Sequence, residues 1–327
     1  MRDINIRDFK LVCGAMSWVS NPSLVAAVSN AKLPEGNGNG RALGVLATGA
    51  MKPDELNEAI GQIKQKTSNT YGVNLIGMSP YYDELVEVCA NHQVPIIVLA
   101  ATVPRREKIE QIKATGAKCI GFATSLRIAQ DMVKNGIDGI IIEGSEAGGH
   151  VGSIATIVLM QEILFHLSNE VPIIVAGGIG SGKMIQHCLK MGASGVQLGT
   201  RFVCAVESPM HETAKEFYIK KQAKDTVVVG AIDPVFSVIP VRVIRNKAVD
   251  DFYAKQREAI RAMNAGEVDA HGAQMMIESF WSGSLRRGVL EGDLEYGSLM
   301  AGQSISFVDS KQTVQEIVET LYNQMVW

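Results

Sequence analysis

Eight short apolar runs, each followed by a helix-length segment, restrict the fold of this chain more than any other feature. Most of the runs lack polar alternation, which is the pattern of strands covered on both faces. Strict alternation of strands and helices implies parallel pairing. The predicted strands are Leu11–Ala15, Leu43–Ala47, Gly72–Ile76, Pro95–Ala101, Cys119–Ala123, Gly139–Glu143, Pro172–Ala176 and Gly195–Leu198.

The segments between these runs are amphipathic and begin with helix start signals. Pro53–Lys66 opens with proline and aspartate, and Tyr82–Asn91 has two acidic residues in its first turn, as the first turn of a helix favours. Eight repeats is the number that closes a (β/α)8 barrel, so we predict an α/β fold of the TIM-barrel type. A doubly wound open sheet is the alternative.

After the eighth run the repeat stops. We predict that residues 1–225 and 298–327 form the barrel and that residues 226–297 form a small helical lobe over the substrate site. The elements predicted beyond the eighth strand are a helix at Met210–Ala223, an extended stretch at Thr226–Val243, a charged helical region at Ala248–Arg287, a turn-rich piece at Gly292–Gln303 and a terminal helix at Lys311–Met325.

Glycine is concentrated in one window of the chain. Of the 32 glycines, 13 lie between Gly136 and Gly199, a window of 64 residues. Glycine permits sharp turns and close approach of another group to the backbone. Many of these glycines lie at or just beyond the C-terminal ends of the last three predicted strands, so we interpret the excess as the wall of one cofactor site.

Composition excludes several classes of protein. The formal charge is −3, from 31 basic and 34 acidic residues, so the whole chain lacks the polycationic footprint of a nucleic-acid-binding protein. The longest near-apolar run, Val94 to Val103, has ten residues, which is too short to span a bilayer. Asp3 lies where a signal peptide would be apolar. Five widely spaced cysteines without a CxxC pair indicate reduced thiols and a cytoplasmic location.

Glycine-containing turns follow the seventh and eighth predicted strands. Gly177–Lys183 matches the GxxxxGK spacing of a phosphate loop, but Met184 follows where a magnesium-binding hydroxyl belongs. Gly177-Gly178 and Gly199-Thr200 nevertheless occupy the two positions where barrels commonly bind phosphate. Backbone N–H groups and the threonine hydroxyl can donate to one phosphate, so we predict a phosphate site. The alternative is that these glycines only permit tight turns.

A second motif spans residues 143–152, after the sixth strand. It contains two carboxylates, one histidine and four glycines in ten residues. His150 is our candidate catalytic residue, because a histidine in a loop with little side-chain bulk can reach a ligand and titrates near neutrality. Asn74, in the third predicted strand towards the catalytic edge, is either a donor to a ring amide or a strand-end turn residue. The other histidines lack metal-ligand spacing, and we predict no metal site.

Three motifs near the predicted strand ends occur together in one known group of enzymes. They are Gly148-Gly149-His150-Val151-Gly152, Ala176-Gly177-Gly178-Ile179, and Gly199-Thr200-Arg201-Phe202 with Glu207-Ser208. In these motifs the chain resembles the superfamily of flavin-dependent nitronate monooxygenases and type II enoyl-acyl-carrier-protein reductases. The resemblance runs from about Cys13 to the last helix and implies an FMN-binding TIM barrel with a small helical lobe.

The resemblance also implies a role for individual residues. His150 would face the substrate side of the flavin, Glu143 would lie beside its ring system, and the glycine turns would bind its phosphate. The residues implied in cofactor binding are Ala15, Met16, Asn74, Glu143, Gly148, Gly149, Ala176, Gly177, Gly178, Gly199, Thr200, Met300 and Gln303.

Two branches of the superfamily differ in their reaction. In the monooxygenase branch the histidine loop resembles AGHPG and a lysine follows the fifth strand, whereas this chain has Gly-Gly-His-Val-Gly and Phe122. The stretches Gly152–Thr156 and Glu291–Gln303 resemble the reductase branch. We therefore expect reduction of an enoyl thioester, or of another small molecule, by NADH or NADPH. Acyl carrier protein and a second copy of the chain are the candidate protein partners.

Two other functions are kept as alternatives. A nitronate monooxygenase would oxidise alkyl nitronates with O2, and His150 would act as its base or hydrogen-bond donor. A barrel that binds a phosphorylated ligand without redox chemistry is the third hypothesis. The spectrum of the purified protein separates this last possibility from the other two, because only a flavoprotein absorbs near ~450 nm.

Two departures from the family pattern bear on the substrate. After the first helix the chain has an apparent insertion, Lys32–Arg41, whose glycine-rich part at residues 36–40 is predicted to be a flexible loop. The first strand carries Cys13-Gly14-Ala15-Met16 where the family usually has Gln-Gly-Gly-Met. We expect flavin binding to survive both changes and the substrate preference to differ.

Overall fold

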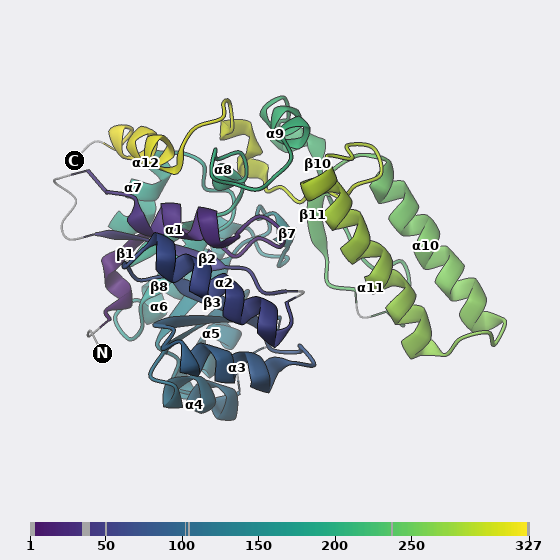
Figure 1. Ribbon diagram of the computed structural model, residues 1–327, viewed down its shortest axis with the longest axis horizontal. Coiled ribbons are helices and arrows are strands. Elements are labelled where there is room, and N and C mark those ends of the chain that lie inside the picture. The colour runs from purple at the N-terminus through teal and green to yellow at the C-terminus, as the bar shows by residue number, and fades with distance from the viewer. Residues whose placement is uncertain are drawn as a thin grey trace.

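Eight parallel strands close into a barrel in the computed structural model of the protein (Figure 1). The structure describes residues 4–34, 40–49, 51–101, 103, 105–236 and 238–325. Consecutive barrel strands pair, and β9 pairs with β1, so the predicted barrel is confirmed and the open sheet is wrong. The barrel strands are β1 Phe9–Cys13, β2 Arg41–Leu46, β3 Gly72–Ile76, β4 Ile96–Ala100, β5 Lys118–Ala123, β6 Gly139–Glu143, β8 Ile173–Ala176 and β9 Gly195–Leu198.

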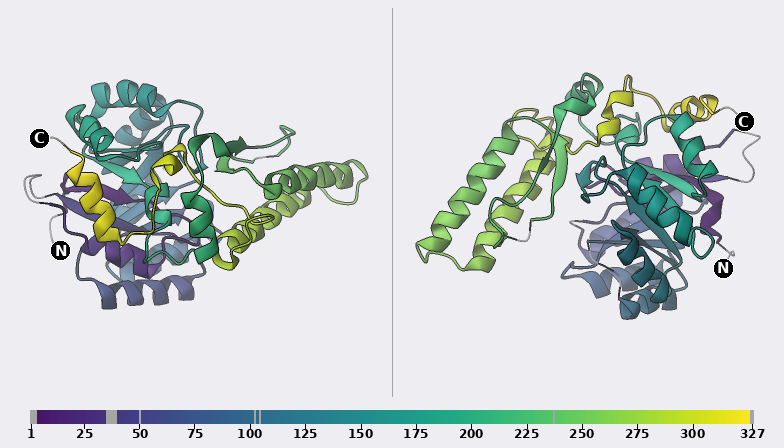
Figure 2. Two further views of the ribbon diagram at one scale, coloured as in Figure 1. Left: turned by 90° about the horizontal axis from the view of Figure 1, so that it is seen from above. Right: turned by 180° about the vertical axis from the view of Figure 1, so that it is seen from behind.

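Helices cover the outside of the barrel (Figures 1 and 2). Side chains at their N-termini satisfy free backbone N–H groups: Asn21 accepts from Leu24 N, and Thr313 accepts from Glu316 N. The predicted helices Pro53–Lys66 and Tyr82–Asn91 are confirmed as α2 and α3. The others around the barrel are α1 Pro22–Asn30, α4 Arg106–Ala114, α5 Leu126–Lys134, α6 Thr156–Leu167, α7 Gly182–Lys190, α8 Thr200–Val203, α9 Glu212–Ile219 and α12 Val314–Asn323, with short turns at η1 Ile6–Asp8, η2 Ala223–Asp225 and η4 Gln303–Phe307.

The first strand begins and ends earlier than predicted. It pairs with β9 only as far as Cys13, opposite Leu198. Ala15 and Met16 therefore lie beyond the strand, in the loop at the C-terminal edge of the barrel. The pattern of apolar residues could not show this end, because Gly14, Ala15 and Met16 continue the apolar run without a polar break.

Two layers of apolar side chains hold the barrel together. The inner layer fills the barrel with residues such as Val12, Val98 and Ile141, and Ile6 of η1 packs against it. The outer layer, which includes Leu11 and Ile97, packs between the strands and the helices. Side chains alternate between the two faces of each strand, and both faces are apolar because both are buried.

The chain beyond α9 forms a lobe that stands away from the barrel (Figure 2). It consists of β10 Thr226–Val229, β11 Val241–Ile244, the helices α10 Lys247–Asn264 and α11 Ala270–Arg286, and the π-helical turn η3 Arg287–Glu291. The predicted single helical region is thus two helices, and α10 is followed by Gly266 in the left-handed conformation. A core of its own includes Phe252 and Trp281, whose ring centroids are 4.6 Å apart.

The lobe contains a sheet that the sequence did not predict. Its strand order is β10, β11 and β7, and β7 is the dipeptide Gly149–His150 from the loop after β6. A loop of the barrel thus supplies the third strand of the sheet in the lobe. The division of the chain into residues 1–225 with 298–327 and residues 226–297 stays a prediction.

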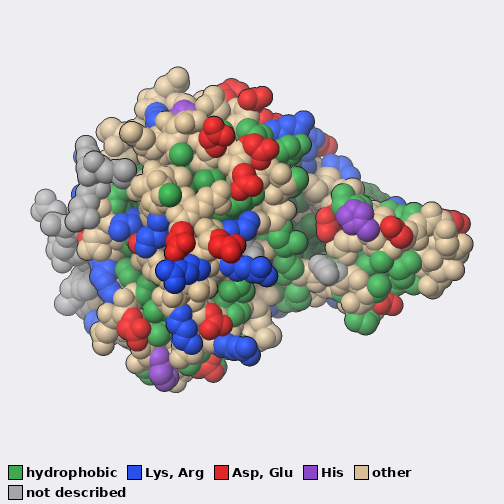
Figure 3. Space-filling view, turned by 90° about the horizontal axis from the view of Figure 1, so that it is seen from below, with side chains coloured by type: hydrophobic (Ala, Val, Ile, Leu, Met, Phe, Trp, Pro, Cys, Tyr) green, Lys and Arg blue, Asp and Glu red, His purple; other side chains and the backbone are tan. Residues whose placement is uncertain are grey.

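Other expectations concern parts of the surface. Residues 36–39 of the predicted glycine-rich loop lie outside the described residues. On the face in Figure 3, acidic and basic side chains are interspersed over the barrel, in line with the small net charge. Of the helices that the structure describes, none is long and apolar enough to cross a membrane.

Close packing of α1 on the barrel predicts opposite effects for two glycine substitutions. A Cβ atom at Gly44 would lie 2.3 Å from the carbonyl oxygen of Val25, whereas one at Gly61, in α2, would meet no atom within 4 Å. Gly44→Ala should lower the free energy of unfolding by about 2 kcal/mol, because overpacking forces the backbone apart. Gly61→Ala should raise it by about 0.5–1 kcal/mol through helix propensity. Urea unfolding checks both, and equal effects would contradict this packing.

Candidate active site

A cavity of about 370 Å³ opens at the C-terminal ends of the barrel strands. Every residue predicted for the site except Gln303 lines it. The backbone N–H of Gln303 instead donates to the carbonyl oxygen of Glu146 at 2.9 Å, while its neighbours Gly302 and Ser304 line the cavity. The predicted residues brought together here are Ala15, Met16, Asn74, Glu143, Gly148, Gly149, His150, Ala176, Gly177, Gly178, Gly199, Thr200 and Met300.

The turn after β8 requires glycine at two successive positions. Gly177 and Gly178 have φ angles of +99° and +72°, a region that residues with a Cβ atom rarely adopt. A Cβ atom on Gly178 would lie 2.9 Å from the Cβ atom of Glu146. The backbone N–H groups of Gly178 and Thr200 have no acceptor among the described residues. Two donors are therefore available to an anion between the turns after β8 and β9.

Thr200 connects the second of these turns to the C-terminal part of the chain. Its hydroxyl oxygen accepts a hydrogen bond from Gly302 N at 2.9 Å. The Tyr218 hydroxyl donates to the carbonyl oxygen of Met300 at 2.7 Å. These bonds hold the segment that carries Met300 along one wall of the cavity.

His150 opens onto the cavity from β7. Its side chain is exposed there, but the protein around it disfavours the charged imidazolium and lowers the pKa of His150 below its usual value. The ring is therefore neutral at pH 7. A neutral imidazole has one N–H donor and one acceptor, so it can polarise a carbonyl or accept a proton.

Glu143 ends β6 at the same cavity. Burial raises the pKa of this carboxyl group from its usual value near 4.5 to about 8, because the charged form loses its hydration. Its side chain makes no hydrogen bond to other residues in the described part of the chain. Glu143 is thus mainly protonated and uncharged at pH 7.

Asn74 is the third of the five residues of β3, whose bounds Gly72–Ile76 agree with the predicted strand, so it lies within the strand and not in a turn at its end. Its side-chain amide donates to the carbonyl oxygen of Val98 at 2.9 Å. This bond fixes the amide in the cavity wall. Among the described residues the Oδ1 atom and the second amide hydrogen have no hydrogen-bond partner, so the ligand-binding interpretation of Asn74 stays a prediction, whereas the turn interpretation is wrong because Asn74 lies within a strand.

Several cavity residues were not anticipated from the sequence. Gln197 projects from β9 beside Gly14, and a polar residue in an apolar strand was the one signal that could have revealed it. Tyr218, Leu285 and Val289 come from helices distant in sequence, and Ile239 comes from the lobe. No local pattern distinguishes these residues from ordinary core.

The second carboxylate of the His150 loop has a structural role. Glu146 accepts hydrogen bonds from the backbone N–H and the hydroxyl of Thr156, both at 2.8 Å. It therefore caps the N-terminus of α6, where a negative charge is favourable.

All five cysteines are buried, and burial raises the pKa of the Cys13 and Cys204 thiols to about 12, which leaves them protonated and poorly nucleophilic.

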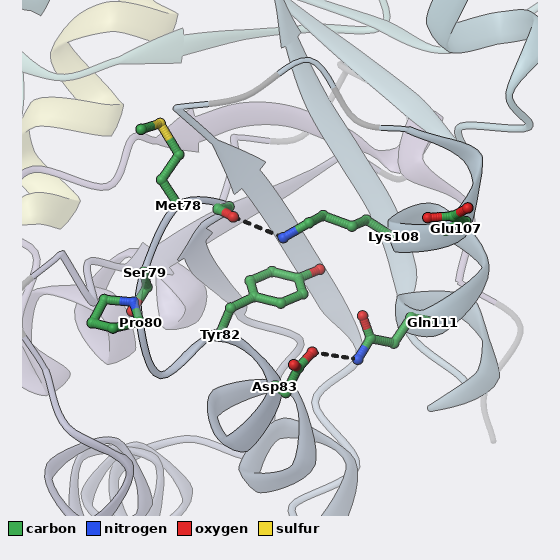
Figure 4. A pocket seen from close by; sticks show the side chains of 9 residues that line it. Met78, Ser79, Pro80, Tyr82, Asp83, Glu107, Lys108 and Gln111 are labelled. Carbon is green, nitrogen blue, oxygen red and sulfur yellow. Dashed lines mark hydrogen bonds between the residues drawn. The ribbon is translucent and has the colours of Figure 1, made fainter. Parts of the chain in front are cut away.

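A second pocket lies outside the barrel between α3 and α4 (Figure 4). Several of its polar groups are paired with one another, although the buried Tyr82 hydroxyl has no hydrogen-bond partner among the described residues. Lys108 donates to the carbonyl oxygen of Gly77 at 2.7 Å and lies 3.5 Å from the ring centroid of Tyr82, and Gln111 donates to Asp83. The cavity at the strand ends is the better candidate, because it holds unpaired donors and two ionisable groups with shifted pKa values.

The comparison with known families decides the identity of this barrel. A family model described as nitronate monooxygenase matches residues 1–81 and 76–324. The chain belongs to the nitronate monooxygenase family. The resemblance noted in the sequence motifs is thereby confirmed, and the protein is a flavin-dependent oxidoreductase.

Three relatives show how far the similarity extends. The structure of FabK from Thermotoga maritima is 37% identical, with a TM-score of 0.81, and the match covers 97% of this chain and 92% of that chain. The enzyme named (3aS,4S,5R,7aS)-5-hydroxy-7a-methyl-1-oxo-octahydro-1H-indene-4-carboxyl-CoA dehydrogenase from Mycobacterium tuberculosis is 28% identical over 94% of this chain and 90% of its own length. A probable nitronate monooxygenase from Staphylococcus aureus is 27% identical over 91% and 89%.

The glycine turn after β8 predicts a specific loss of flavin affinity. Gly178→Ala combines left-handed strain with a contact to Glu146 at the cavity wall, so we expect the flavin to bind about 10-fold more weakly, equivalent to about 1.4 kcal/mol. Gly136→Ala is the matched control, because Gly136 also has a positive φ, +84°, but no atom lies within 4 Å of its Cβ position. Flavin fluorescence titration measures both, and equal losses would remove the turn from the binding site.

The raised pKa of Glu143 predicts a pH-dependent stability. An unfolded chain releases this proton near pH 4.5, whereas the folded protein retains it to about pH 8. Glu143 therefore makes its full contribution to the free energy of unfolding below pH 4.5. That contribution falls by about 1.4 kcal/mol per pH unit as the pH rises to 8. Relative to Glu143→Gln, the flavin-free wild type should lose free energy of unfolding across this window. Parallel pH profiles in urea unfolding would contradict the assignment.

Proposed function

We propose that the protein is an FMN-dependent enoyl-thioester reductase that uses NADH or NADPH. The observation that carries this proposal is the charge of the cavity. None of the described residues that line it is lysine or arginine, and the pKa shifts of Glu143 and His150 keep both groups neutral at pH 7. An uncharged enoyl thioester can enter such a cavity without losing a counterion, whereas a nitronate anion would have no cation to pair with.

The residues present fit the flavin. The unpaired N–H groups of Gly178 and Thr200 suit a terminal phosphate, and the missing Cβ atoms after β8 leave room for it to approach the backbone. A single phosphate between these turns favours FMN. When bound, the flavin supplies the hydride-transfer chemistry. Asn74 and Gln197 offer amide groups to its polar ring atoms.

The chain's own residues position and polarise the substrate. His150, as a neutral imidazole, donates a hydrogen bond to the thioester carbonyl, which makes the conjugated double bond a better hydride acceptor. Glu143, protonated at pH 7, is a second donor at the same cavity. Apolar side chains such as Phe122, Leu285 and Val289 exclude water from the reacting groups.

The relatives support a thioester substrate. FabK represents the reductase branch and is 37% identical, against 27% for the probable nitronate monooxygenase. The relative from Mycobacterium tuberculosis is named as the dehydrogenase of a carboxyl-CoA compound, which is also a thioester. Acyl carrier protein as the substrate carrier, assembly of two copies and a cytoplasmic location stay predictions.

Nitronate oxidation is the second candidate, because a 27% identical relative carries that name. A side-by-side assay separates the two. NAD(P)H-dependent loss of crotonyl-thioester absorbance supports the reductase. Oxygen uptake with propionate 3-nitronate or a nitroalkane, in the absence of nicotinamide, would instead establish the monooxygenase and overturn the proposal.

Substitution of the cavity histidine predicts a loss of turnover without loss of cofactor. His150→Ala should retain bound FMN, visible near ~450 nm, and lower kcat for crotonyl-thioester reduction by at least about 100-fold. His166→Ala is the control, because His166 lies on the exposed face of α6 and, among the described residues, its ring hydrogen-bonds only to the carbonyl oxygen of Glu162. Near-normal turnover of His150→Ala would remove this residue from the mechanism.

A further inference from the structure

The loop that carries His150 depends on contacts from outside itself. Between β6 and α6 it contains Gly144, Gly148, Gly149 and Gly152, so its backbone has more conformational freedom than most loops. Few of its hydrogen bonds are internal, such as Ala147 N to the carbonyl oxygen of Gly144. A side chain on such a loop keeps one position only if neighbouring elements hold the backbone.

The lobe supplies part of that support through strand pairing. His150 lies opposite Val241 and Gly149 lies opposite Arg242 in the antiparallel pair of β7 and β11. The backbone N–H of Val151 donates to the carbonyl oxygen of Pro240 at 3.0 Å. The backbone of the cavity histidine is therefore part of the sheet of the lobe.

Arg242 adds a side-chain link to the start of the same loop. Its Nε and Nη2 atoms both donate to the carbonyl oxygen of Ser145, at 3.3 and 2.9 Å, and its Nη1 atom donates to the Thr226 hydroxyl at 3.2 Å. The residue is 9% exposed. Burial lowers the pKa of Arg242 below its usual value, and the negative charge of Glu146 offsets part of this effect. This charged group is thus held between the lobe and the loop and satisfied by both.

The contacts continue from the loop into the cofactor side of the barrel. Glu146 accepts from the backbone N–H of Thr156, and the Thr156 hydroxyl lies within hydrogen-bond distance of both Glu146, at 2.8 Å, and the carbonyl oxygen of Gly177, at 3.1 Å. A continuous set of polar contacts therefore joins β11 of the lobe to the turn after β8.

We propose that Arg242 is a positioning residue for His150, which couples the lobe to the loop between β6 and α6 through the carbonyl oxygen of Ser145. Pairing with β11 fixes the loop at Gly149 and His150, and Arg242 fixes it at Ser145, so together they leave Gly148 between these points little freedom. The inference concerns the same site as the proposed function. It holds for any substrate on which His150 acts, because it depends on the position of the loop alone.

The test compares Arg242→Met, which keeps the side-chain volume without donors, Arg242→Lys, which keeps the charge and one donor group, and Arg245→Met. Arg245 is the matched control, because it follows on the same segment and its side chain is exposed. Hydrogen exchange of the backbone amides of residues 145–151 is measured in each holoenzyme, together with kcat and KM for crotonyl-thioester reduction and the flavin dissociation constant.

We expect Arg242→Met to speed exchange in residues 145–151 and to lower kcat about 10-fold, because small displacements of a positioned group reduce turnover strongly. KM should change less than about 3-fold, since the lining of the cavity is intact. Arg242→Lys should recover part of both losses, and Arg245→Met should match the wild type. A drop in melting temperature for Arg242→Met with unchanged exchange and unchanged kcat would overturn the proposal and leave Arg242 a stability residue.

Two further arms keep the outcome decisive. If Arg242→Met does not fold, Thr226→Val is measured in its place, because it removes the acceptor at the lobe side of the guanidinium. It should speed exchange in residues 145–151 and lower kcat, both by less than expected for Arg242→Met. Unchanged exchange would count against the proposal. If the wild type does not reduce crotonyl thioester, the proposed function fails on its own. Loop exchange and the flavin dissociation constant then still decide the role of Arg242.

Discussion

The pairing of β1 with β9 is the interaction on which the rest of the structure depends. It joins Leu11, Val12 and Cys13 to Val196, Gln197 and Leu198, and thereby removes both edges of an eight-stranded parallel sheet. Closure brings the C-terminal ends of all the barrel strands to one rim. Loops that are far apart in sequence can therefore build a single cavity, and the helices that cover the outside bury the second face of every strand.

Close approach of backbone to backbone is the second constraint, and it acts most strongly at the rim. The turn after β8 passes near the start of α6, so that Gly177 and Gly178 must bend in a conformation that other residues avoid. The same bend leaves N–H groups unpaired. The proposed anion site and the tightly packed turn thus have a common origin in the absence of two side chains.

The chemistry of the cavity follows from burial. Removal from water favours the neutral forms of Glu143 and His150, which moves their pKa values in opposite directions. The site can donate hydrogen bonds and exclude water while it carries little charge of its own. The lobe contributes to this site through the apolar side chains of Ile239, Leu285 and Val289 at the cavity and through the strand that holds the backbone of His150.

The sequence by itself determined the barrel, the positions of its strands to within a few residues and the glycine turns that line the cavity, because strand and helix periodicities and glycine placement are local signals. It also located Glu143 and His150, since the first ends the sixth predicted strand and the second lies in the loop after it. Only the tertiary structure decided that Glu146 caps a helix and that the lobe forms a sheet with the His150 loop. Tyr218, Leu285 and Arg242 reach the site from distant segments, and such contacts depend on the three-dimensional path of the chain, which no local pattern records.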